Sequence, residues 1–173
     1  SDEYYFAKDM VSNIEFRYLE VYEKIMGALH CKDVVLFQMP VQFMCNASGN
    51  LTDGCGALIT MEDEDILKLE ELGNLLISKQ RQVCQRYQWL YIDGVSDLLR
   101  NHGYCSADQS WFVFISESLE NQGDINGSVH PNETGHKKIA EMAFPAIKRK
   151  LQTVHVPTMP GTIQPIVESL RNN

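Results

Sequence analysis

The sequence has no apolar run that approaches the roughly 18 to 20 residues that a membrane-spanning helix needs. It is also short of basic residues, with 15 Lys and Arg against 23 Asp and Glu and a formal net charge of -8. The basic run Lys148-Arg149-Lys150 is too short to offset that charge, so we expect neither nucleic acid nor anionic membranes as partners. No Cys-x-x-Cys pair is present and no charged-then-apolar segment opens the chain, so we expect no metal, no cofactor and no signal peptide in these residues.

The composition is that of an ordinary globular domain. The 173 residues are 44% hydrophobic with a mean hydropathy of -0.24, which is enough for one full core. We therefore expect one domain over residues 1–152, followed by an extended C-terminal arm over 153–173 that contains three prolines.

The cysteines and glycosylation sequons point to an oxidising compartment. Five cysteines and four Asn-x-Ser/Thr sequons predict a secreted, extracellular or lumenal glycoprotein. We predict disulfides between Cys45 and Cys55 and between Cys84 and Cys105, with Cys31 free or bonded to sequence outside this chain. The sequons begin at Asn46, Asn50, Asn126 and Asn132. We expect glycans on the first two, because the others flank the histidine discussed below.

Hydrophobic periodicity predicts an alternation of helices and strands. Long helices are expected over residues 3–29, 62–87 and 133–151, and a shorter one over 95–100. The apolar stripe of the first should face a sheet, and Pro145 should kink or divide the last. The runs Val34 to Phe37 and Trp89 to Ile92 read as buried parallel strands. This order predicts an α/β fold with three layers around a parallel sheet.

Two features beside the strands have two interpretations each. The run Trp111 to Ile115 is either a short edge strand in the core or an apolar rim to a pocket. Asp93 closes the second strand, where it could cap the next helix or enter a ligand crevice; we favour the cap.

His130 is the candidate catalytic residue. It ends a polar loop and precedes Pro131 and Asn132, which suit the start of a helix whose apolar residues follow at helical spacing. An imidazole on a loop held by a packed helix is placed as a general base requires. The alternative is a surface histidine in a helix-capping loop.

The pattern His-Pro-Asn-x-x-Gly-His from His130 to His136, followed by an apolar helix, resembles the last sequence block of the SGNH (GDSL-type) hydrolases, a family of serine esterases and lipases. The stretches Asp33 to Pro40 and Leu99 to Trp111 are similar to other segments of that family, so the resemblance covers the chain to about Leu151. It implies a flavodoxin-like α/β/α domain, of which residues 1–152 are the C-terminal portion without the N-terminal strand or strands. It also implies that His130 is the general base and that His136 has no chemical role.

The sequence departs from the family at three places. The usual carboxylate three residues before the histidine is replaced by Gly127, so His130 needs another orienting group. The candidates are Asp124 and the backbone carbonyl of Ser128, and we favour the carbonyl. The family's oxyanion asparagine falls on Ser1, and no Gly-Asp-Ser occurs in the chain. The nucleophilic serine is therefore expected in sequence not present here, in an N-terminal segment or a second chain of the same protein.

Two functions follow as expectations. The first is a serine-dependent carboxylic ester hydrolase in which His130 is the general base. Its ester substrate would carry an apolar acyl or acetyl group, which Trp111, Phe112 and Phe114 could contact. The second is a non-catalytic, hydrolase-like binding module in a secreted or cell-surface protein, favoured by Gly127 and Ser1.

Overall fold

The computed structural model describes residues 2–29, 33–41, 45–50 and 63–153. Its elements are α1 (Asp2–Ser12), α2 (Ile14–Leu29), β1 (Val35–Phe37), α3 (Asp63–Tyr87), β2 (Leu90–Ile92), α4 (Val95–Leu99), α5 (Ile115–Gln122) and α6 (Glu133–Thr153). Two short 3-10 helices, Arg100–His102 and Ala107–Gln109, lie between α4 and α5. Residues 1, 30–32, 42–44, 51–62 and 154–173 lie outside the described residues, and so does the predicted C-terminal arm beyond Thr153.

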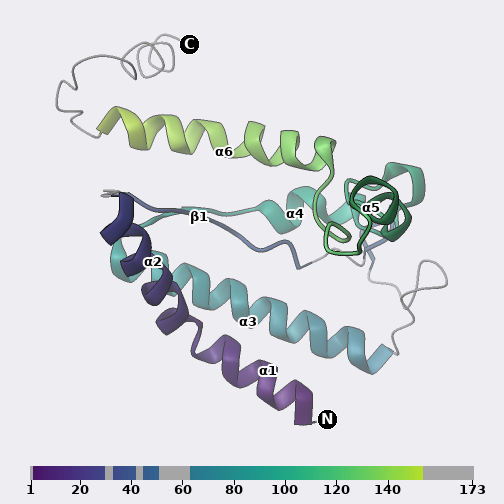
Figure 1. The fold of residues 1–173 in the computed structure, drawn as a ribbon, viewed down its shortest axis with the longest axis horizontal. Coiled ribbons are helices and arrows are strands. Elements are labelled where there is room, and N and C mark those ends of the chain that lie inside the picture. The colour runs from purple at the N-terminus through teal and green to yellow at the C-terminus, as the bar shows by residue number, and fades with distance from the viewer. Residues whose placement is uncertain (1, 30–32, 42–44, 51–62, 154–173) are drawn as a thin grey trace.

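The two predicted strands form a parallel pair, as expected. Val35 pairs with Leu90 and Phe37 with Ile92. Further hydrogen bonds extend the ladder, from Leu90 N to Val34 O at 3.0 Å and from Gln38 N to Ile92 O at 2.9 Å. Figure 1 shows α6 on one side of the strands and α3 with α2 on the other. The fold of the described residues is therefore mixed α/β, mostly helical with a small parallel sheet.

The core lies between β2, α4 and α6. Its buried members are Ile92, Val95, Leu99, Tyr104, Phe112 and Ala143. Phe112 and Leu99 are fully buried, so the run that begins at Trp111 contributes to the core. Apolar residues of α6 pack against this cluster because they recur on one side of the helix.

The predicted helix over residues 3–29 is two helices that separate at Asn13. Ser12 Oγ donates to Lys8 O at 2.7 Å, and Asn13 Nδ2 donates to Asp9 O at 3.0 Å. Such bonds from a side chain to the preceding turn compete with the helical ladder and bend or end a helix. The part of the stripe on α1 does not face the sheet as predicted, since α1 packs on α3 and has no buried residue.

The last helix is not divided at its proline, which leaves the kink as the part of that prediction still untested. α6 runs from Glu133 to Thr153 with Pro145 inside it. Pro145 removes one helical donor, but Ile139, Ala143 and Ile147 pack against the core on both sides of it. Packing therefore holds the helix where local propensity alone would break it.

Both predicted disulfides are wrong. Cys45 and Cys84 are free thiols, and both are buried. Burial raises the pKa of the Cys84 thiol to about 11, which keeps it protonated. Cys84 faces the interior from α3. Cys105 is disulfide-bonded, and its backbone forms a parallel β-bridge with that of Asn46. Cys31 and Cys55 lie outside the described residues.

No helix in the described segments is both long enough and apolar enough to cross a membrane.

Candidate functional site

The loop that carries His130 is fixed by backbone hydrogen bonds to the segment that contains Phe112. Val129 N donates to Val113 O at 3.1 Å, and Val113 N donates to His130 O at 2.9 Å. Phe112 and Pro131 form an antiparallel bridge between these bonds. Because Phe112 is fully buried, the backbone on both sides of His130 is attached to the core.

Asn132 fixes the other end of the loop as the cap of α6. Its Oδ1 accepts a hydrogen bond from Gly135 N at 3.0 Å, and its Nδ2 donates to Ser110 O at 3.2 Å. A side chain at Gly135 would lie 2.6 Å from Trp111 O, so this close approach requires glycine. The predicted cap is therefore present, and it ties the start of α6 to the loop before Phe112.

The ring of His130 is held by the backbone two residues earlier. Nδ1 lies 3.0 Å from the carbonyl oxygen of Ser128, which is a buried residue. A carbonyl only accepts hydrogen bonds, so this contact places a proton on Nδ1 and leaves Nε2 of the neutral ring as an acceptor. Nε2 has no partner within the described part of the chain. The contact is the one expected for an orienting carbonyl, and the catalytic role stays a prediction.

The residue between these two has a strained backbone. Val129 has φ of 55°, in the left-handed region that β-branched residues rarely adopt. Val129 N and Val113 O form one of the bonds that impose this conformation. Strained positions of this kind cluster at functional sites.

Asp124, the alternative orienting residue, is bound elsewhere. Its Oδ1 accepts hydrogen bonds from Asn126 N at 2.8 Å and Gln122 Nε2 at 3.1 Å. A side chain at Gly127 would lie 2.6 Å from Nε2 of Gln122, the flexible end of a side chain on α5. Among the described residues, no carboxylate hydrogen-bonds to the ring of His130.

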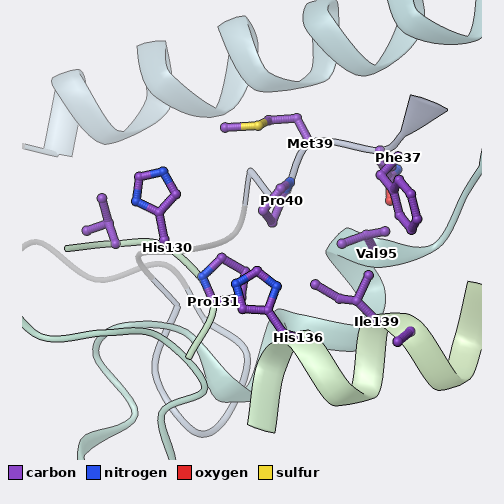
Figure 2. A pocket seen from close by; sticks show the side chains of 11 residues that line it. Phe37, Met39, Pro40, Val95, His130, Pro131, His136 and Ile139 are labelled. Carbon is purple, nitrogen blue, oxygen red and sulfur yellow. The ribbon is translucent and has the colours of Figure 1, made fainter. Parts of the chain in front are cut away.

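A cavity of about 610 Å³ adjoins His130. It lies at the carboxyl end of β1 and extends to the first turns of α4 and α6, the location expected for a ligand crevice in a parallel α/β fold. The residues that line it are Phe37, Gln38, Met39, Pro40, Val95, Val129, His130, Pro131, His136, Ile139 and Ala140. Figure 2 shows His130 rising from its loop, with Met39 and Pro40 across the space and Ile139 on α6.

The apolar wall does not come from the predicted aromatic run. Trp111 stacks on the ring of His102, with centroids 3.6 Å apart, while Phe112 and Phe114 pack in or against the core. The wall is instead formed by the residues after β1 and on α6. This correction follows from the antiparallel bridge to Pro131, which turns the run toward the core.

Two other predicted residues can be placed. Asp93 does not cap α4, whose cap position is Gly94 with φ of 83°. Its carboxylate instead binds Arg81 at 2.8 Å, and that guanidinium lowers the pKa of Asp93. Ser1, the predicted oxyanion donor, lies outside the described residues.

Gln38 and His136 both line the cavity. The sequence analysis predicts no role for Gln38 and no chemical role for His136. Gln38 was detectable as the polar residue that ends a short apolar run, although β1 is largely exposed within the described residues. His136 lies one helical turn after Asn132, on the same helix as Ile139.

Within the described segments, no group of three His, Cys, Asp or Glu side chains could hold a metal ion. No protein-family model, no curated protein and no solved structure matches this chain.

Proposed function

We propose that this chain carries the histidine-bearing part of a serine-dependent carboxylic ester hydrolase of the SGNH type. The observation that carries the proposal is the ring of His130, which is anchored at Nδ1 by Ser128 O and leaves Nε2 unpartnered among the described residues beside a cavity of about 610 Å³. The nucleophilic serine belongs to residues outside this sequence.

In the proposed reaction, Nε2 of His130 takes the proton of the serine hydroxyl as the serine oxygen attacks the ester carbonyl carbon. The resulting imidazolium returns a proton to the leaving alcohol, and an acyl-enzyme remains. Water then hydrolyses the acyl-enzyme by the same proton transfers in reverse. The neutral carbonyl of Ser128 orients the ring and selects its tautomer, but it stabilises the imidazolium less than a carboxylate would.

The cavity supports a substrate with an apolar acyl or acetyl group. Met39, Val95 and Ile139 contribute apolar side chains to its wall. Burial of a ligand group as large as one of these side chains contributes about 1.5 to 3 kcal/mol to the binding free energy. An apolar acyl chain beside the base is therefore the substrate class that these residues favour.

The outer edge of β1 supports completion of a three-layer fold by further chain. Val34 O and Gln38 N bond to β2, so by alternation the backbone groups of Val35 and Phe37 point the other way. Within the described residues, neither the N–H and C=O of Val35 nor the N–H of Phe37 has a partner. Parallel sheets are normally buried and have more than two strands. An N-terminal segment or a second chain of the same protein is the proposed source of the added strand and of the serine.

A secreted or lumenal location remains part of the proposal. Asn50 is exposed, as a glycosylation site must be, whereas both polar atoms of the Asn132 amide are hydrogen-bonded. These states favour glycosylation at Asn50 over glycosylation at Asn132.

A non-catalytic binding module is the second candidate. The observation that favours it is the absence, among the described residues, of a carboxylate in contact with His130. The same cavity would then bind a ligand without chemistry.

The deciding experiment measures hydrolysis of p-nitrophenyl acetate by the full-length protein and its His130→Ala variant. We expect turnover to fall about a hundredfold or more, with the melting temperature nearly unchanged because His130 is exposed. Asp124→Asn should cost little, since Asp124 does not contact the ring. Full hydrolysis by the His130→Ala protein would reject the enzyme and leave the binding module.

A further inference from the structure

Gln38 is a buried polar residue whose side-chain amide has a partner at only one end within the described residues. It directly follows β1, is 5% exposed and lines the cavity beside His130. Its Oε1 accepts a hydrogen bond from Ser96 N at 2.9 Å. Because a backbone N–H only donates, this bond identifies which end of the amide is oxygen and which is nitrogen.

The nitrogen end of that amide has no partner in the part of the chain that the structure describes. Within the described residues Nε2 of Gln38 has no hydrogen-bond acceptor, although it carries two N–H groups. A buried donor without an acceptor costs about 1 to 3 kcal/mol, so native proteins rarely keep one without a reason.

A second buried glutamine shows what a purely structural amide looks like. Gln80 on α3 is 4% exposed and lies on the other side of β1. Its Nε2 donates to Tyr18 Oη at 3.0 Å, and its Oε1 accepts from Met39 N at 3.1 Å. Both ends of that amide are used within the protein. Gln38 differs because its nitrogen end has no partner among the described residues and its side chain borders the cavity.

We propose that the Nε2 group of Gln38 donates a hydrogen bond to a carbonyl oxygen of the ligand bound in this cavity, so that the site selects apolar compounds that carry a carbonyl. The other polar side chains on the wall are His130 and His136, and the rest of the wall is apolar. A ligand with an apolar body and one oxygen acceptor matches that arrangement. For its choice of an ester carbonyl this inference rests on the proposed function, but the binding itself needs no catalysis.

The position of Gln38 is set independently of any ligand. Ser96 N holds the carbonyl end of the amide, and Ser96 Oγ donates to Met39 O at 3.1 Å. Gln38 N is bonded to Ile92 O within the ladder. The donor is thus held in place before a ligand arrives, which is the condition for a bond that discriminates between ligands.

The test compares two probes of similar size in the full-length protein. Acetophenone carries a carbonyl oxygen, and isopropylbenzene has a methyl group in its place. Dissociation constants are measured by NMR shift titration for the wild-type protein and for Gln38→Met. We expect acetophenone to bind about three- to tenfold more weakly to the variant, the ratio of a typical net hydrogen bond, with no weakening for isopropylbenzene.

Two further variants keep the test decisive. Gln38→Glu keeps an acceptor for Ser96 N and removes the amide donors, so it carries the test if circular dichroism shows that Gln38→Met is unfolded. Val95→Ala trims the apolar wall and should weaken both probes equally.

Equal weakening of both probes by Gln38→Met, or no saturable binding of acetophenone to the wild-type protein, would overturn the inference. Failure here is separate from failure of the proposed function. Loss of the carbonyl preference leaves the His130→Ala result standing, and full hydrolysis by His130→Ala leaves the binding result standing.

Discussion

The two sides of the sheet are held together by different interactions. On the side of α4 and α6, buried apolar residues such as Leu99 and Phe112 form a continuous core. On the side of α1 and α2, exposed charged pairs join the helices to α3: Lys8 with Glu71, and Arg86 with Glu15. His130 and the cavity belong to the first side, where packing keeps a site rigid. The continuous apolar core lies on the side where the site is built, while the buried residues on the other side, such as Ile77 and Val83, belong to α3.

The largest test of this difference removes one aromatic ring from each side. Phe112→Ala should lower the free energy of unfolding by about 3 to 5 kcal/mol, because the ring is fully buried and its loss leaves a cavity. Phe6→Ala on α1 should change it by less than about 0.5 kcal/mol, because that ring is 68% exposed. Urea titration followed by circular dichroism measures both. Similar losses from the two substitutions would show that α1 is buried in the intact protein and would break the comparison.

A smaller difference in stability is expected between alanine substitutions of two asparagines, one on each side of the sheet. Asn132→Ala removes the cap of α6 and the bond to Ser110 O, and should cost about 1 to 2 kcal/mol. Asn13→Ala should be neutral or slightly stabilising, because Asn13 interrupts an exposed helical segment that alanine favours. Thermal melts of the two variants decide the point, and a larger loss at Asn13 would contradict it.

The strain at Val129 predicts an inverted order of two substitutions. Alanine normally stabilises a protein relative to glycine, but φ of 55° reverses this preference. Val129→Gly should therefore be more stable than Val129→Ala by about 1 kcal/mol. At Val83, which is buried within α3, the same pair should show the ordinary order with alanine the more stable. The usual order at residue 129 would mean that the left-handed backbone does not persist in solution.

The smallest expected effect is that of low pH on the contact between α1 and α3, which includes the pair of Lys8 and Glu71. Hydrogen bonds from Lys8 and Tyr4 lower the pKa of Glu71 below its ordinary value of 4.5. A lowered folded-state pKa contributes stability above the unfolded-state pKa, and that contribution is lost as the pH falls through the folded-state pKa. Hydrogen exchange at pH values below 4.5 should therefore show faster exchange in α1, with α6 still protected. Added salt should act in the same direction, because these groups are exposed. Uniform loss of protection in both helices would argue that the two sides open together.

Much of the fold was predictable because its determinants are local. The strands around Leu36 and Tyr91 follow from short apolar runs, and the start of α6 follows from Asn132 as its cap. The contact between His130 and Ser128 O joins residues two apart, so a turn in the sequence was enough to suggest it. These features need no knowledge of distant neighbours.

The features that sequence reasoning missed depend on distant contacts. Whether Cys84 pairs or stays free depends on what surrounds α3, and the unsatisfied donor of Gln38 appears only when Ser96 takes the other end of the amide. The burial of Phe112 likewise follows from its bridge to Pro131. Periodicity contains no information on these pairings, because each joins segments that are well separated in the chain.

The capping amide of Asn132 also has a consequence for the order of events in biosynthesis. A sugar attached to Nδ2 would take the place of one of its N–H groups and would have to occupy the space beside Ser110 O. In a newly made chain, glycosylation of Asn132 and closure of the His130 loop thus exclude each other, and the faster process prevails. A glycan on Asn132 would mark molecules in which the sugar was attached before α6 had docked. The fraction of molecules with this glycan would therefore report how fast the loop folds relative to glycosylation.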